Sequence, residues 1–432
     1  MKRVAFYTLG CKVNRYDTEA MIAQFEQPGY QIVDFKREAD IYIINTCTVT
    51  KQGASKSRKI TRRAKRRNPD ALVAVVGCYP QVDPEQVMEI AEVDLVVGTK
   101  GRSKIVEFIE QAISSKEQLN FVQDMDEKEV FEEVPIQNFT ERTRATIKIQ
   151  EGCNQFCSYC IIPYARGSLR SRELDDVMAE AGRLVKHGFQ EIVLTGIHLG
   201  EYGADKENLD LVKLIKELLT IAGLERIRLS SIEGTEVSEE LIELIAESEK
   251  LCRHLHLPLQ SGSDKVLKAM NRPYQVADFK KMIVMIREQV PEIAITTDVI
   301  VGFPGESEAD FEKTYQLMKE LEFSDAHIFK YSKREGTPAA GFKEQVHSKV
   351  KKKRSKKLRE LTAELARNYQ QQFIGQKLEV LLEESRDYKT GLLTGLTDNY
   401  LRVFVDGADD LAGQLVEVKL KQEAGRIIGS LE

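Results

Sequence analysis

Three cysteines, Cys153, Cys157 and Cys160, stand close together in the segment GCNQFCSYCIIP. Thiolate sulfur binds soft metals, so this grouping indicates a metal centre rather than a disulfide framework. Zinc sites usually combine two separated ligand pairs, and no histidine follows at the spacing of a zinc knuckle. A cubane [4Fe–4S] cluster normally takes four thiolates, so three cysteines leave one iron open to another ligand. The spacing favours a cluster over a zinc site.

Three further cysteines, Cys11, Cys47 and Cys78, are far apart in the chain but occupy equivalent places. Each follows an apolar segment, in FYTLGC, YIINTC and VAVVGC, at intervals of about one strand–helix unit. The carboxyl ends of parallel strands lie along one sheet edge, so these cysteines can converge there. The pattern predicts a second cluster with an open iron. Zinc with a fourth ligand and three buried structural thiols remain the alternatives, and no histidine occurs in this region.

The elements around the separated cysteines predict an N-terminal α/β domain over residues 1–114. Alternating strand and helix patterns are typical of a parallel sheet. The predicted strands are VAFYTLG, IYIINTCTV, LVAVVGC and DLVVG, and the helices between them are DTEAMIAQFEQ, the basic segment 54–67 and PEQVMEIAE. An acidic linker from Glu117 to Glu141, with Pro135 inside it, follows.

A longer strand–helix series over residues 139–369 predicts a barrel or partial (β/α)6 barrel, whose ligands would gather at the carboxyl ends of its strands. The predicted strands are ATIKIQEG, EIVLTGI, RIRLSSIE, HLHLPLQ, ITTDVIVGF and DAHIFKYS. His254 and His256 alternate along HLHLPLQ and so share a face. A place in the core or the barrel lining is favoured for them over catalysis, and a substrate contact stays open. Cys252 is expected to be an unliganded thiol.

The last part of the chain, residues 371–432, changes to short alternating strands. KLEVLLEES, GLLTGLTDNYLRVFVDG and GQLVEVKLKQ are separated by turn residues, which predicts a small all-β, OB-like module. The start of the chain lacks a signal-peptide pattern, and no apolar run reaches the ~20 residues of a membrane span. We therefore expect a soluble cytoplasmic protein without membrane contact.

Positive charge is concentrated in two blocks, although the formal net charge is −5. A solvated helix face would explain either block alone, but two dense blocks in an acidic chain favour a polyanionic partner, most simply a nucleic acid. The candidate phosphate contacts are Lys56, Arg58, Lys59, Arg62 and Arg63 in KQGASKSRKITRRAKRR, and Lys352, Lys353 and Arg354 in SKVKKKRSKKLRE.

The cysteine loop after the first barrel strand resembles that of the radical S-adenosylmethionine (SAM) superfamily, in which SAM binds the open iron. The resemblance continues down the barrel in the same order, although each segment alone is an ordinary strand-to-loop junction. It implies that Tyr159 packs near the adenine of SAM and that Thr195 and Gly196 in EIVLTGIHLG meet its amino group. It also implies that Glu233 in SSIEG contacts the ribose of SAM. The backbone of Val301, Gly302 and Phe303 in DVIVGFPGE would meet the adenine.

Seven segments together resemble the methylthiotransferases, radical SAM enzymes with an N-terminal cluster domain, a barrel and a C-terminal TRAM domain. They are LGCKVNRYDTE, INTCTVT, VVGCY, GCNQFCSYCIIPYARG, LTGIHLG, HLHLPLQSGSDKVLKAMNR and TTDVIVGFPGE. The variants LGCKVN, NTCTVT, CSYCIIPYARG and TGIHLG are similar to the branch that acts on N6-threonylcarbamoyladenosine in tRNA. The isopentenyladenosine branch is the alternative substrate class, and a non-catalytic iron–sulfur RNA-binding protein is the alternative outside enzymes.

The resemblance implies that a methylthio group replaces the hydrogen on C2 of adenosine 37, next to the tRNA anticodon. Side-chain acids and bases cannot remove such a hydrogen, so no catalytic side chain is assigned and the chemistry falls to cofactors. The implied cofactors are SAM and two [4Fe–4S] clusters, each on three cysteines. The implied partners are the anticodon stem-loop of tRNA, an electron donor such as flavodoxin or ferredoxin, and a sulfur donor. We expect the chain to be a monomer, because nothing in the sequence demands a larger assembly.

Overall fold

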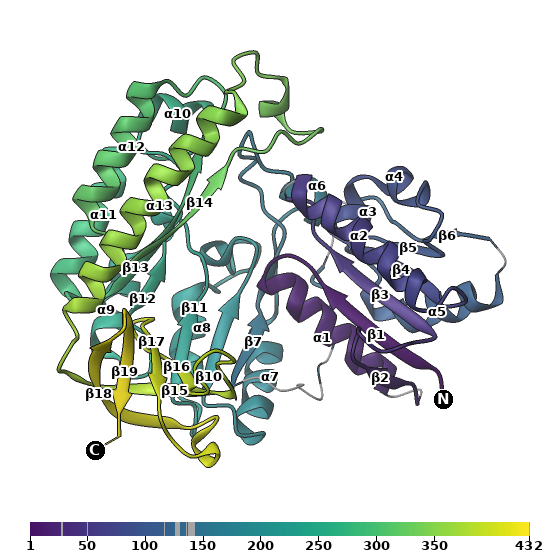
Figure 1. The fold of residues 1–432 in the computed structure, drawn as a ribbon, viewed down its shortest axis with the longest axis horizontal. Helices are drawn as coiled ribbons and strands as arrows, with labels where there is room; N and C mark the ends of the chain where they lie inside the picture. Colours follow the sequence, from purple (N-terminus) through teal and green to yellow (C-terminus); the bar gives the residue numbers. More distant parts are fainter. Residues whose placement is uncertain are drawn as a thin grey trace. The chain divides into compact units, whose positions relative to one another are not determined.

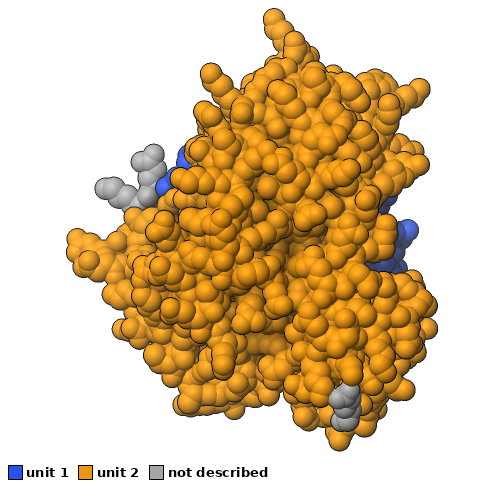
Figure 2. Space-filling model, turned by 90° about the vertical axis from the view of Figure 1, so that its left-hand side faces the viewer, with its two compact units in different colours: residues 1–140, 150–172, 332–340 blue, residues 141–149, 173–331, 341–432 orange. Residues whose placement is uncertain are grey.

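The structure is a computed structural model that describes residues 1–26, 29–49, 51–115, 117–125, 130–134, 136 and 143–431. Pro135 and residue 139, where the barrel domain is expected to begin, lie outside the described residues. The chain divides into two compact units, which Figure 2 colours separately. Unit 1 comprises Met1–Thr140, Gln150–Arg172 and Ser332–Ala340, and unit 2 comprises Glu141–Ile149, Glu173–Tyr331 and Gly341–Glu432. Among the described helices, none has the length and hydropathy of a membrane span.

Unit 1 is built on a six-stranded parallel sheet with the strand order β2-β1-β3-β4-β5-β6 (Figure 1). The strands are β1 (Arg3–Thr8), β2 (Gln31–Val33), β3 (Ile41–Thr46), β4 (Leu72–Gly77), β5 (Leu95–Val97) and β6 (Leu119–Asn120). The central strands β3 and β4 are buried along their whole length, as expected of parallel strands covered on both faces. The four predicted strands are present, and β2 and β6 are two additional short edge strands.

Helices cover both faces of this sheet. They are α1 (Lys12–Glu26), α2 (Lys51–Arg67), α3 (Cys78–Val82), α4 (Pro84–Met88) and α5 (Ile105–Ser114), with the 3-10 turn η1 (Arg102–Lys104) before α5. Phe25 of α1 and Phe108 of α5 pack with Ile43 on one face, while Ile60 of α2 packs with Ile44 on the other. Unit 1 also contains the two-stranded ribbon β8 (Gln150–Glu151) and β9 (Arg170–Ser171), with α6 (Ile162–Arg166) between its strands.

Unit 2 begins with six parallel strands that confirm the predicted partial barrel (Figure 1). They are β7 (Arg144–Lys148), β10 (Glu191–Thr195), β11 (Arg226–Leu229), β12 (His254–His256), β13 (Ala294–Val301) and β14 (Asp325–Lys330). They form the sheets β11-β10-β7 and β12-β13-β14, which the parallel bridges Ile227–Leu251 and Ser231–His256 connect. Within the described residues β7 and β14 do not pair, so the barrel is open there.

Helices line the outer face of the barrel strands. They are α7 (Leu174–Lys186), α8 (Leu211–Leu219), α9 (Glu239–Glu247), α10 (Asp264–Ala269), α11 (Val276–Gln289), α12 (Glu308–Leu321) and α13 (Ser348–Gln371), with the 3-10 turns η2 (Leu199–Glu201) and η3 (Gly234–Glu236). Phe311, Met318 and Leu321 of α12 are buried at helical spacing. The second basic block begins α13, which packs beside β14 and α12.

The C-terminal module is a closed five-stranded barrel with the order β15-β16-β17-β19-β18, which confirms the predicted small all-β fold. Its strands are β15 (Lys377–Arg386), β16 (Leu393–Thr397), β17 (Arg402–Val405), β18 (Leu415–Glu423) and β19 (Arg426–Ser430), and η5 (Asp409–Leu411) lies before β18. Val380, Val403 and Leu420 form part of its buried core. Closure leaves the module without an open sheet edge.

The C-terminal module docks on the amino-terminal ends of the barrel strands through two buried arginines. Arg226 of β11 donates to the carbonyls of Leu396 and Glu379, at 3.1 and 3.0 Å. Arg228 donates to the carbonyls of Asp398 and Thr397, at 2.8 and 3.0 Å. These four hydrogen bonds all use backbone acceptors of the module.

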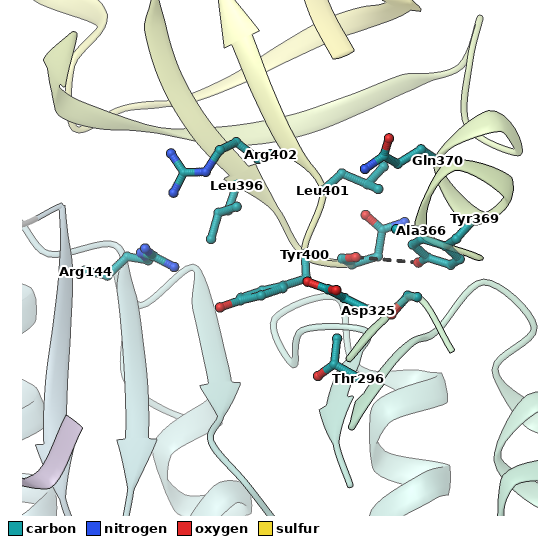
Figure 3. A pocket seen from close by; sticks show the side chains of 12 residues that line it. Arg144, Thr296, Asp325, Ala366, Tyr369, Gln370, Leu396, Tyr400, Leu401 and Arg402 are labelled. Atoms are coloured by element: carbon teal, nitrogen blue, oxygen red, sulfur yellow. Dashed lines mark hydrogen bonds between the residues drawn. The ribbon is translucent and has the colours of Figure 1, made fainter. Parts of the chain in front are cut away.

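An aromatic contact and a pocket complete this junction. The Tyr400 ring stacks on His254, with 4.2 Å between the ring centroids. A pocket of about 290 Å³ lies beside it (Figure 3), and Arg144, Tyr369 and Arg402 contribute to its lining. Barrel and module thus form one packed body inside unit 2.

Candidate metal centres and cofactor site

The three separated cysteines lie at the carboxyl ends of three neighbouring strands, as the sequence predicts. Cys11 follows β1, Cys47 follows β3 and Cys78 follows β4 as the first residue of α3. These strands are adjacent and parallel in the order β1-β3-β4, so their carboxyl ends lie along one sheet edge.

Asn14 contacts two of these cysteines, and Gly10 lies close to the third. The Asn14 Oδ1 atom lies 3.8 Å from the Sγ atoms of both Cys11 and Cys78. Gly10 has a φ of +111°, and a Cβ atom there would lie 2.9 Å from the Cβ of Cys47. A side chain at position 10 would thus collide with the third cysteine. The cysteine pattern alone does not single out Asn14, although it stands inside LGCKVN.

A buried arginine at the end of α6, just after the motif of Cys153, Cys157 and Cys160, contacts this cysteine cluster. Arg166, at the end of α6, is 1% exposed, and its Nε donates to the Sγ of Cys78 at 3.3 Å. Its Nη1 pairs with Asp17 Oδ2 at 2.8 Å and with Glu151, and its Nη2 donates to Asn14 Oδ1. Arg166 therefore links a cysteine of the N-terminal sheet to the segment that carries the other three.

The carboxylates that hold Arg166 are shared with a second buried arginine. Arg102 binds Asp17 at 2.6 Å, Glu151 at 2.9 Å and Glu132 at 3.0 Å. Burial alone would lower the pKa of Arg166, but Cys78, Glu151 and Asp17 raise it well above its usual range. Arg166 therefore stays charged, and its guanidinium lies against the thiol of Cys78.

Burial disfavours the thiolate form of two cysteines in this cluster, Cys47 and Cys78. Burial raises the pKa of the Cys78 thiol to about 12, and it also raises the pKa of Cys47. A soft metal ion favours the thiolate form, and the guanidinium of Arg166 offsets negative charge on the ligand set. The donor chemistry at this edge therefore fits an iron–sulfur cluster.

The second cysteine motif forms a compact loop between β8 and α6 in unit 1. The backbone N–H of Cys153 donates to the carbonyl of Gly167 at 3.1 Å, which closes the start of the loop. The N–H of Cys160 donates to the carbonyl of Cys157 at 2.9 Å, which forms a tight turn. Cys157 is buried and the other two cysteines are half-buried. Three thiols on one short loop fit a cluster with one iron free of protein ligands.

Backbone geometry explains the glycine before this loop. Gly152 has a φ of +76°, and a Cβ atom there would lie 1.8 Å from the carbonyl oxygen of Ser168. Phe156, inside the loop, also has a positive φ of 46° and is half exposed. Tyr159 is half-buried, so its ring keeps some accessible surface.

The SAM candidates of the barrel lie at the carboxyl ends of β10 and β13 in unit 2. Thr195 is the last residue of β10 and Val301 is the last of β13, while Gly196, Gly302 and Phe303 follow directly. The side chains of Thr195, Val301 and Phe303 are buried. The Gly302 N–H donates to Glu306 Oε2 at 2.6 Å, so one backbone donor of this segment is already engaged.

Glu233, the ribose candidate, lies on the loop after β11 and already has a cationic partner. Its Oε2 atom pairs with Arg272 Nη2, and the Arg272 guanidinium lies 5.0 Å from the centroid of the Tyr274 ring. A ribose contact would therefore share the carboxylate with Arg272. Arg272 stands in the segment KAMNR, where no local pattern predicts its pairing with Glu233.

Three family models match the chain: the Radical SAM superfamily at residues 147–318, Uncharacterized protein family UPF0004 at residues 3–98 and the TRAM domain at residues 371–425. The chain is also 47% identical over 423 residues to a Bacillus subtilis (strain 168) protein named threonylcarbamoyladenosine tRNA methylthiotransferase MtaB. That match covers 97% of this chain and 94% of the relative. The chain belongs to the radical SAM tRNA methylthiotransferases.

Other relatives of this methylthiotransferase divide between two named activities. A Clostridium tetani (strain Massachusetts / E88) protein named tRNA-2-methylthio-N(6)-dimethylallyladenosine synthase is 38% identical, over 96% of this chain and 92% of the relative. Among solved structures, the radical SAM methyltransferase TsrM from Kitasatospora setae has a TM-score of 0.57 and 17% identity, over 78% of this chain and 77% of that chain. This structural likeness shows a shared fold.

The first basic block of the methylthiotransferase forms α2, which has one packed side and one exposed side. Lys56, Lys59 and Arg63 are exposed, so their charges are available to a phosphate, and Arg62 is exposed beside Glu92 at 3.7 Å. Arg58 is half-buried and donates to the Tyr79 hydroxyl at 2.8 Å. The helix therefore offers three of the five predicted contacts on its open side.

In the second basic block, the structure contradicts one predicted phosphate contact, Arg354. Lys352 and Lys353 are exposed on α13, but Arg354 is buried and pairs with Glu306 at 2.5 Å and Glu308 at 3.0 Å. Its charge is therefore unavailable to a phosphate. Because Glu306 also accepts from Gly302, Arg354 instead supports the segment that follows β13.

The seventh cysteine of the methylthiotransferase, Cys252, is buried in unit 2, on the loop before β12. Burial raises the pKa of its thiol to about 12, against the opposing effect of Arg228. A protonated buried thiol is a poor nucleophile. The expectation that Cys252 binds no metal stays a prediction.

Proposed function

We propose that this methylthiotransferase replaces the C2 hydrogen of N6-threonylcarbamoyladenosine, next to the anticodon of tRNA, with a methylthio group. The match over 97% of the chain to the Bacillus subtilis relative of that name carries the proposal. Two separate sets of three cysteines support it, because the overall change needs both a radical source and a sulfur carrier. The dimethylallyladenosine substrate class is the second candidate, favoured only by relatives of lower identity.

One [4Fe–4S] cluster belongs to Cys153, Cys157 and Cys160, and the other belongs to Cys11, Cys47 and Cys78. When bound, the clusters and SAM supply the radical and sulfur chemistry that side-chain acids and bases cannot perform. The chain itself binds and orients these groups. The strand ends at Thr195–Gly196 and Val301–Phe303, with Glu233 and Tyr159, would hold SAM, and Arg166 offsets negative charge at Cys78.

The partners follow from the chemistry. Each radical event consumes one electron, so a low-potential carrier such as flavodoxin or ferredoxin supplies it. A separate sulfur donor must restore the sulfur that leaves with each product. The enzyme acts as a cytoplasmic monomer, in the compartment where tRNA and these carriers are found.

Mass spectrometry of tRNA nucleosides tests the proposed substrate. In a strain that lacks the gene, 2-methylthio-N6-threonylcarbamoyladenosine is expected to disappear, and a plasmid copy is expected to restore it. Loss of the isopentenyl derivative alone would instead show that the second candidate substrate is correct. Retention of both products in the deletion strain contradicts the enzyme assignment for these RNAs.

Removing the positive charges on the exposed side of α2 is expected to weaken tRNA binding and to make the binding constant depend less steeply on salt. In the combined variant Lys56→Ala, Lys59→Ala and Arg63→Ala, each lost phosphate contact lowers the slope of log K against log salt by about 0.7. Fluorescence anisotropy with labelled anticodon stem-loop at several salt concentrations measures this slope.

The double variant Lys216→Ala and Lys280→Ala is the control for this measurement. These two lysines also lie on the surface, but their ammonium groups pair with Glu240 and Glu320. Their removal is expected to leave the salt slope unchanged. An equal loss of slope in control and α2 variants would mean that α2 has no specific role in RNA binding.

A further inference from the structure

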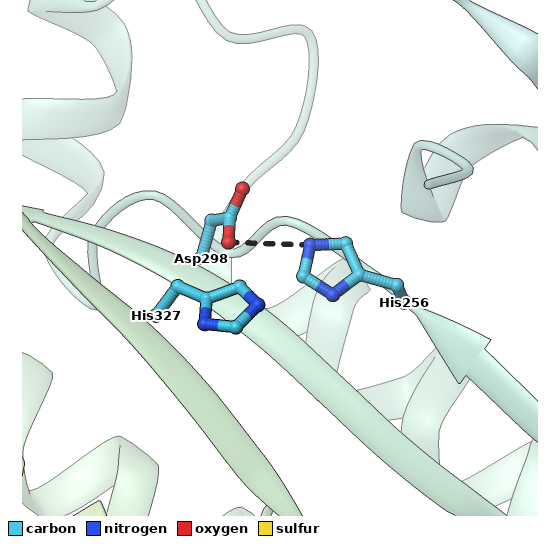
Figure 4. A group of neighbouring side chains, drawn as sticks. All are labelled: His256, Asp298 and His327. Carbon is cyan, nitrogen blue, oxygen red and sulfur yellow. Dashed lines mark ion pairs between the residues drawn. The ribbon is translucent and has the colours of Figure 1, made fainter. Parts of the chain in front are cut away.

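A cluster of two histidines and one aspartate lies on three neighbouring barrel strands of unit 2 (Figure 4). His256 ends β12, Asp298 lies in β13 and His327 lies in β14, where Asp298 and His327 are direct partners in the strand register. One potential ligand atom from each residue lies within 4.8 Å of the other two.

The side chains of this cluster point into the barrel. The intervening strand residues Leu255, Val299 and Ile328 are buried on the helix-covered face. Because side chains alternate along a strand, the cluster occupies the opposite, inner face. Asp298 is half-buried and His327 is exposed, so this inner wall is accessible.

His256 is fixed by its contacts, whereas Asp298 and His327 can still bind a ligand. His256 is held at both ring nitrogens, with Nδ1 2.9 Å from Thr296 Oγ1 and Nε2 3.2 Å from Asp298 Oδ1. That Oδ1 atom is buried, and its contact with His256 lacks the geometry of a hydrogen bond. Within the described residues, no group hydrogen-bonds the His327 ring, which lies 5.8 Å from the His256 ring between centroids. The Asp298 side chain nevertheless stays 25% exposed, so its carboxylate offers an acceptor beside the exposed His327 ring.

The cluster lies far enough inside the barrel for a substituent of the reacting base to reach it. Asp298 precedes Val301, the SAM candidate at the end of β13, by three residues. At about 3.3 Å per residue, this places Asp298 about 10 Å further into the barrel. A purine whose C2 faces the strand ends carries its N6 substituent on the same ring, within reach of this wall.

We propose that Asp298 and His327 form the subsite that receives the polar N6 substituent of the substrate adenosine, with His256 positioning Asp298. This inference rests on the proposed function. A threonylcarbamoyl group carries ureido N–H donors, a hydroxyl and a carboxylate. Asp298 accepts from an N–H or the hydroxyl, and the His327 ring donates to the carboxylate.

The subsite selects against a hydrocarbon substituent. An isopentenyl group would remove water from Asp298 and His327 without replacing any hydrogen bond, and such unpaired buried groups are costly. Sites built to hydrogen-bond a substrate reject analogues that lack the group far better than apolar pockets reject an added one. These residues thus distinguish the two adenosine classes that the relatives modify.

The variant His327→Phe tests the subsite, because it keeps a ring of similar shape and removes both nitrogens. Binding is measured with two anticodon stem-loops that differ only in the presence of the threonylcarbamoyl group. The preference of the wild-type enzyme for the modified RNA is expected to fall about 10-fold to 100-fold in the variant. His327→Gln, which keeps an N–H donor, is expected to recover part of it.

The variant His187→Phe, at an exposed position after α7, is the control and is expected to keep the preference. Iron content and the unfolding midpoint verify that each variant folds. An unchanged preference in His327→Phe overturns the subsite. Wild-type enzyme that converts only isopentenyladenosine RNA refutes the proposed function instead. Stoichiometric zinc binding that His327→Phe abolishes, with unchanged RNA preference, shows a metal site in place of the subsite.

Discussion

Replacing Cys157 by alanine is expected to abolish reductive cleavage of SAM and to halve the iron content, from about eight to about four per chain. Cys157 is the buried member of the loop triad, and two remaining thiols cannot hold a cubane that also binds SAM. Anaerobic reconstitution, iron analysis and chromatographic detection of 5′-deoxyadenosine measure both effects.

The variant Cys47→Ala separates the roles of the two triads. It is also expected to lose about four irons, but it should still cleave SAM while it fails to form methylthiolated RNA. Cys252→Ala removes a buried thiol outside both triads and is expected to keep the full iron content. Full product formation by Cys47→Ala would contradict the role assigned to the N-terminal triad.

Replacing Arg166 by methionine is expected to lower the free energy of unfolding by about 3–5 kcal/mol. The side chain is 1% exposed and satisfies Asp17, Glu151 and Asn14. Methionine fills similar space but leaves two buried carboxylates with only Arg102 as their shared cation. Urea denaturation of the reconstituted enzyme, followed by circular dichroism, measures the change.

Arg62→Met is the matched control for this prediction. Arg62 is 58% exposed at its side chain and lies 3.7 Å from Glu92, so its ion pair is screened by solvent. Its replacement is expected to change the unfolding free energy by less than about 1 kcal/mol. Similar stability of Arg166→Met and the wild-type enzyme would show that Arg102 alone satisfies the buried acids.

The strands and their order in the chain could be predicted, because apolar periodicity is a local signal. All six barrel strands and the cysteine positions after β1, β3 and β4 agree with the structure. The edge strands β2 and β6 have three and two residues, too few for a periodic pattern. Their pairing depends on the neighbouring strand rather than on their own composition.

The charged network could not be predicted, because ion pairs between distant residues leave no local pattern. Asp17 and Arg166 are 149 positions apart and meet only through the fold. Arg354 is different, since Leu358, Leu361 and Leu365 continue its buried stripe along α13. Extending that helical spacing back by one turn would have placed Arg354 on the packed side.

The junction between the partial barrel and the C-terminal module has a consequence for how this family can vary. Arg226 and Arg228 donate to main-chain carbonyls, which every amino acid supplies. Most side chains of the module can therefore change without loss of these bonds, as long as its loop keeps the same backbone path. The outer surface of the module can therefore be altered for different RNAs while these hydrogen bonds to the catalytic barrel stay the same.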